Sequence, residues 1–114
     1  MSINLSEIEA ARLLIATTAR KMLAGELSYI EGSRTIVASL PAAQVDNTDE
    51  FMAFIGIDSE TDRFPMGTAR DQWQSHALAS MQQELDKAEG WAKSYGEPAC
   101  IKVIERLEKR PFEF

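Results

Sequence analysis

The feature that most constrains this chain is a helical pattern that continues for about six turns in its second half. The spacing predicts one helix from Thr68 to Tyr95, which Thr68 caps and Gly96 ends. One apolar face runs along it, formed by Trp73, Ala77, Met81, Leu85, Ala88, Trp91 or Ala92, and Tyr95. A helix with such a face is stable only when other elements cover it, so the rest of the chain must supply packing partners.

A first helix is predicted near the start of the chain. Ser6 and Glu9 have capping-box spacing, and Gly25 is placed to end the helix in a left-handed conformation. Leu14 and Leu23 widen a predicted buried stripe made by Ile8, Ala11, Ile15, Ala19 and Met22.

A second helix follows after a short connection, which predicts an antiparallel hairpin. Ser28 and Glu31 repeat the capping-box spacing, and Pro41 is expected to end the helix. Gly32 lies inside this helix, where glycine is unfavourable. Either it marks a close approach between helices or the helix begins later than Ser28.

The remaining elements are less regular. The apolar run from Phe51 to Ile57 is predicted to be a helix capped by Asp49, because the alternative is a lone strand with no evident pairing partner. A loop is expected from Asp58 to Gly67. Pro98 should begin a last helix that carries Cys100 on its apolar side.

These elements predict an all-α fold, a single-domain bundle of four to five helices that spans residues 1–114. The chain of 114 residues is 45% hydrophobic and 26% charged, which is ordinary for a globular protein. Its single cysteine and the absence of a targeting or membrane-spanning pattern favour a cytoplasmic location.

The charge balance narrows the classes of partner. Eighteen acidic and twelve basic residues give a net charge of −6, which disfavours binding to nucleic acid and to anionic membranes. An acidic surface favours basic partners, although a charge of this size is also common in proteins without one. Self-association into a homo-oligomer stays open.

Alternating carboxylates at Asp58, Glu60 and Asp62 suggest the first half of a calcium loop, but the match fails further on. Arg63 replaces the required glycine, and Ala69 stands at the position of the bidentate glutamate. We therefore expect no metal or other cofactor. A structural interpretation is that Arg63 and Arg70 form ion pairs with these carboxylates.

The competing interpretation of this segment is a binding surface. Its predicted residues are Asp58, Glu60, Asp62, Arg70 and Trp73. No catalytic residues are predicted, because the lone histidine, His76, has no nucleophile and base arranged around it and Cys100 is expected to be a small buried apolar residue.

The stretches Glu31-Gly32-Ser33-Arg34 and Ile57 to Asp62, with Pro65, Gly67, Arg70 and Trp73, resemble small bacterial proteins of uncharacterised families. Some small acidic proteins of this kind serve as immunity partners of secreted toxins. Small size, negative charge, the lack of catalytic motifs and a polar loop beside a long helix predict a noncatalytic protein-interaction domain that binds another protein. The resemblance implies an immunity-type inhibitor as one form of it. The alternative function is a small-ligand or divalent-metal-binding domain with its site near residues 58–73.

Overall fold

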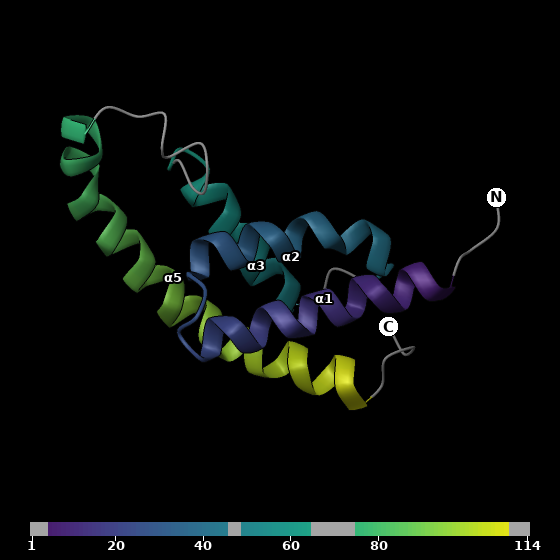
Figure 1. Ribbon diagram of the computed structural model, residues 1–114. Coiled ribbons are helices and arrows are strands. Elements are labelled where there is room, and N and C mark those ends of the chain that lie inside the picture. Colours follow the sequence, from purple (N-terminus) through teal and green to yellow (C-terminus); the bar gives the residue numbers. More distant parts are fainter. Residues whose placement is uncertain (1–4, 46–48, 65–74, 110–114) are drawn as a thin grey trace.

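The computed structural model describes residues 5–45, 49–64 and 75–109, and these form four helices (Figure 1). They are α1 (Leu5–Leu23), α2 (Tyr29–Ala43), α3 (Asp49–Thr61) and α5 (Ser75–Lys109). The predicted all-α class is confirmed for this part of the chain. The predicted helix start at Thr68 lies outside the described residues.

Helices α1 and α2 form the predicted antiparallel hairpin (Figure 1). Gly25 ends α1 with a φ of +77°, as expected for a left-handed terminal residue. The Ser28 hydroxyl caps α2 by accepting a 2.9 Å hydrogen bond from the Glu31 amide. Gly32 marks a close helix approach, because a Cβ atom there would lie within 3.0 Å of the Met22 side chain.

The end of α2 differs from the prediction, since the helix continues through Pro41 to Ala43. Gln44 then adopts a left-handed conformation with a φ of 51°. The buried Arg12 of α1 donates hydrogen bonds to the carbonyl oxygens of Ala43, at 2.8 Å, and Gln44, at 3.3 Å. These bonds satisfy carbonyls that a helix end leaves unpaired, so a residue distant in sequence supports the extra turn.

The run from Phe51 to Ile57 is helical, as predicted. The prediction of a loop from Asp58 is wrong, because α3 continues to Thr61. Thr61 is buried one turn after Ile57, and its hydroxyl donates a 2.6 Å hydrogen bond to the Ile57 carbonyl. Arg34 of α2 donates to the Thr61 carbonyl at the helix end and to the Phe64 carbonyl beyond it. Packing and this cap extend the helix into a segment rich in turn-forming residues.

The expected break at Gly96 and Pro98 is also wrong, because α5 runs without interruption from Ser75 to Lys109. Gly96 is buried, and a Cβ atom there would lie 3.0 Å from Tyr29 and 3.1 Å from Ile57. Its missing side chain therefore allows close packing. Helix α5 bends along its length (Figure 1), as a proline inside a helix favours.

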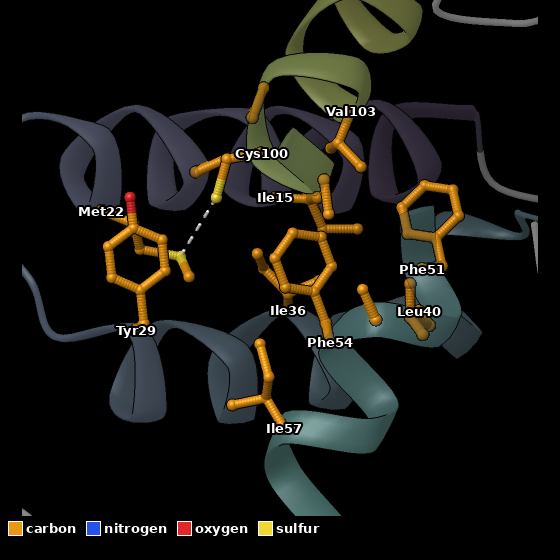
Figure 2. Packing of buried hydrophobic residues seen from close by; sticks show 14 of the residues in the cluster. Ile15, Met22, Tyr29, Ile36, Leu40, Phe51, Phe54, Ile57, Cys100 and Val103 are labelled. Carbon is orange, nitrogen blue, oxygen red and sulfur yellow. Dashed lines mark hydrogen bonds between the residues drawn. The ribbon is translucent and has the colours of Figure 1, made fainter. Parts of the chain in front are cut away.

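One hydrophobic cluster joins all four helices, as Figure 2 shows from close by. Cys100 is fully buried, as predicted, and its thiol lies 4.0 Å from the Met22 sulfur. Two predicted core residues of α1 are instead on the surface: Leu14 is 48% exposed and Leu23 is 38% exposed. The buried face of α1 is thus narrower than the sequence pattern indicated.

Candidate functional site

Asp58, the first of the predicted site residues, has a structural role. Its carboxylate forms an ion pair with Arg34, whose Nε lies 3.7 Å from Oδ1, and so helps to hold the arginine that caps α3. Arg63 and Arg70 were predicted to form ion pairs with the carboxylates of this segment. Arg63 instead pairs with Glu84 of α5, at 2.9 Å. Arg70 lies outside the described residues, so its pairing stays a prediction.

The other predicted site residues are not gathered into one described site. Glu60 follows Asp58 by two positions, about 200° around the helix, so the two carboxylates point to different sides of α3. Glu60 is exposed and lines a groove against α5, and Asp62 is exposed. Trp73, like Arg70, lies outside the residues that the structure describes.

The groove that Glu60 lines has a volume of about 650 Å³ and lies between the end of α3 and α5. Phe64 contributes a buried ring to it, and the guanidinium of Arg63 lies 4.3 Å from the centre of that ring. Lys87 and Trp91 line the groove from α5. The groove therefore combines apolar surface with charges of both signs.

Trp91 and Tyr95 form a stacked aromatic pair on α5. Their ring centres are 5.6 Å apart, their planes differ by 10°, and the residues are 43% and 50% exposed. Tyr95 lies over α3, because its Cε1 would be 3.7 Å from a Cβ atom on Gly56. The pair therefore presents two large, stacked rings at the surface.

The buried face predicted for this helix included Tyr95 and either Trp91 or Ala92, and the structure corrects that prediction. Ala92, rather than Trp91, is buried there, and Tyr95 is half exposed. Small residues at Ala88, Ala92, Gly96 and Ala99 form the row that approaches the other helices. The spacing of these small residues was a signal in the sequence for the exposure of the pair, because Trp91 and Tyr95 each lie one position before a member of this row.

Around the aromatic pair, two neighbouring rows of side chains form a surface that we name the α3–α5 strip. Each row follows helical steps of three and four positions. The α3 row is Asp49, Met52, Gly56 and Glu60, and the α5 row is Lys87, Trp91, Tyr95, Pro98 and Lys102. Beside the two ends of the strip, α3 or the turn after it is tied to α5 by the ion pairs Arg63–Glu84, at 2.9 Å, and Glu50–Arg106, at 3.1 Å.

A second groove, of about 480 Å³, lies between α1 and the end of α5. Leu13, 67% exposed, lines it, and Arg20 forms an ion pair with Glu108 across it. The carboxylate accepts from Arg20 Nε at 2.7 Å. This pair raises the pKa of Arg20, because the guanidinium is hydrogen-bonded to a negative charge.

The buried groups offer little chemistry at neutral pH. Burial raises the pKa of the Cys100 thiol to about 12, and nearby Glu97 adds to the shift. Burial likewise raises the pKa of Tyr29 to about 12. Both groups therefore hold their protons at neutral pH, whereas a nucleophilic cysteine acts as the thiolate.

Two further observations concern the described part of the chain. Its cysteine and acidic side chains do not gather in groups of three or more that could hold a metal ion. Among the same residues, no helix is long and apolar enough to cross a membrane.

Comparison of the chain with protein-family models, with curated proteins and with solved structures gives no match.

Proposed function

We propose that this chain is a noncatalytic protein-interaction domain that binds its partner through the α3–α5 strip. The observation that carries the proposal is the exposed, stacked pair Trp91–Tyr95. Tryptophan and tyrosine are the residues most enriched among those that dominate binding energy at protein interfaces. An immunity-type inhibitor that binds a toxin is the form of this function that the resemblance implies.

The rigidity of the strip supports the proposal. Stacking fixes the two rings before binding, so little side-chain entropy is lost when a partner covers them. The ion pairs beside its ends hold α3 and α5 in place. Apolar groups at the centre and charged groups at the ends match the usual arrangement of a protein interface.

The proposal is tested by capture of binding proteins from lysate of the source cells. Trp91→Ala removes half of the aromatic pair, and Leu13→Ala is the matched control because it also removes an exposed apolar side chain, from α1. We expect a protein that wild type and Leu13→Ala retain and that Trp91→Ala binds at least about 10-fold more weakly. Equal retention by all three chains would remove the strip as the binding surface.

A small-ligand-binding domain is the second candidate function, and the groove beside Trp91 favours it. Its volume of about 650 Å³ is in the range of ligand sites, and it presents apolar, cationic and anionic groups together. A ligand at about 100 times its dissociation constant should stabilise the fold by about 2.7 kcal/mol. Thermal unfolding against a compound library tests this, and stabilisation that Lys87→Ala abolishes would support the groove.

A further inference from the structure

The α3–α5 strip has a charge pattern that is complementary to itself. The α3 row carries acidic residues at both ends, Asp49 and Glu60, and the α5 row carries basic residues at both ends, Lys87 and Lys102. All four side chains are exposed. Within the described ranges, none of the four forms an ion pair with another side chain. Between these ends the strip presents its apolar groups. The two acidic and two basic residues of the strip balance, although the whole chain has a net charge of −6.

The two rows run in opposite directions, which fixes the charges that lie at each end. Tyr95 lies over Gly56 at the middle of the strip. Arg63, just after α3, pairs with Glu84, whereas Glu50 at the start of α3 pairs with Arg106. Glu60 therefore lies at the same end as Lys87, and Asp49 at the same end as Lys102.

We infer that the strip binds a second copy of this chain through a two-fold axis that runs parallel to the strip. This inference rests on the proposed function, because it uses the same strip, and it adds self-association to the binding of another protein. Such an axis places the α5 row of each copy over the α3 row of the other. Glu60 then faces the partner's Lys87, and Asp49 faces the partner's Lys102. Tyr95 then covers the partner's Gly56, Trp91 lies between it and the partner's Glu60, and Pro98 faces the partner's Met52.

The other two-fold arrangement of the same surface is disfavoured. An axis that crosses the strip at right angles reverses its ends and places α5 over α5. Lys87 would then approach the partner's Lys102, and like charges in an interface oppose association. The charge pattern thus selects one of the two face-to-face arrangements.

The size of the strip sets the expected strength of association. From Lys87 to Lys102 the helix rises about 22 Å, and two packed helices, each about 10 Å across with axes about 9 Å apart, present a face about 19 Å wide. Each copy then buries about 400 Å², and the total of about 800 Å² is below the roughly 1,200 Å² of stable complexes. We therefore expect weak, reversible dimers at about 0.1 to 1 mM protein.

Sedimentation equilibrium from about 0.01 to about 1 mM protein tests the inference with a charge exchange. The two-fold axis makes the contact between Glu60 and Lys87 occur twice in the dimer. Glu60→Lys alone and Lys87→Glu alone each turn both contacts into pairs of like charge, so each should raise the dissociation constant at least about 10-fold. The double variant Glu60→Lys/Lys87→Glu keeps the net charge of −6 and restores opposite charges. We expect its dissociation constant to lie within about 3-fold of wild type.

Two outcomes would overturn the inference: wild type that stays monomeric at about 1 mM, or a double variant as weak as the single variants. Circular dichroism of all four chains confirms that these exposed substitutions leave the helices intact. Failure of the inference is distinguishable from failure of the proposed function. If wild type is monomeric but a different protein is retained by wild type and lost by Trp91→Ala, the strip is an interaction surface for another partner.

Discussion

Gly32 illustrates how single residues set helix spacing in this protein. A Cβ atom there would overlap Met22, which is only 1% exposed and is held in the core. We expect Gly32→Ala to lower the free energy of unfolding by about 1–3 kcal/mol, measured by urea unfolding. Gly90→Ala is the matched control because its site is open, and it should stabilise the fold by about 0.5–1 kcal/mol. Equal effects of the two substitutions would contradict the close approach of α1 and α2.

Cys100 and Tyr29 predict how stability depends on pH. The pKa of each rises to about 12, from 9.0 and 10.0, mainly because burial disfavours the charged form. The folded chain therefore binds these protons more tightly than the unfolded chain does. Their contribution is fully present below about pH 9 and is lost as the pH rises toward 12.

Urea unfolding between about pH 8 and about pH 11 should therefore show a falling free energy of unfolding. In Cys100→Ala, the free energy of unfolding should fall less over this pH range, because one of the two groups is absent. The variant should also be less stable than wild type at every pH, because it loses a buried side-chain atom. A wild-type free energy that is constant or rises over this range would contradict the burial of the two groups.

At the scale of elements, the start of α2 is held by another helix. The Glu89 carboxylate of α5 accepts hydrogen bonds from the Tyr29 and Ile30 amides. We expect Glu89→Ala to lower the free energy of unfolding by about 1–2 kcal/mol, and Glu89→Gln by less, because the amide keeps an acceptor oxygen. Asp86→Ala is the control, since Asp86 is exposed and bonds to Gln82 on its own helix. A change of similar size in the control would argue against the cap.

The continuity of α5 is testable by amide hydrogen exchange. In an unbroken helix the amides of Ala99 and Cys100 bond to carbonyls one turn earlier, and both residues are buried. We expect slow exchange at both positions. A helix break at Gly96, as the sequence indicated, would instead give fast exchange there.

The sequence predicted local features well and tertiary ones poorly. The Gly25 terminus and the Ser28 cap depend on residues that are adjacent in sequence, so their patterns were sufficient. The extensions of α2 and α3 depend on Arg12 and Arg34, whose contacts reach other helices and have no local signal. Propensity for a turn is weak compared with such contacts.

The candidate site shows the same limit. Glu60 was predicted and lines the described groove, but Asp58 supports the end of α3. Tyr95 was assigned to the core, and Trp91 was left as an alternative to Ala92 there, because they continued an apolar spacing. Apolar spacing alone does not distinguish the side of a stripe that is covered from the side that is exposed. The position of α3 over Tyr95 was needed to recognise the strip.

For the whole molecule, the central claim is that association occurs through the α3–α5 strip. Amide and indole NMR spectra of wild type at about 0.05 and about 1 mM test it residue by residue. We predict concentration-dependent shifts at Met52, Gly56, Glu60, the Trp91 indole and Tyr95, and unchanged signals at the exposed Leu13 of α1. Shifts centred on Leu13, or identical spectra at both concentrations, would contradict self-association through this surface.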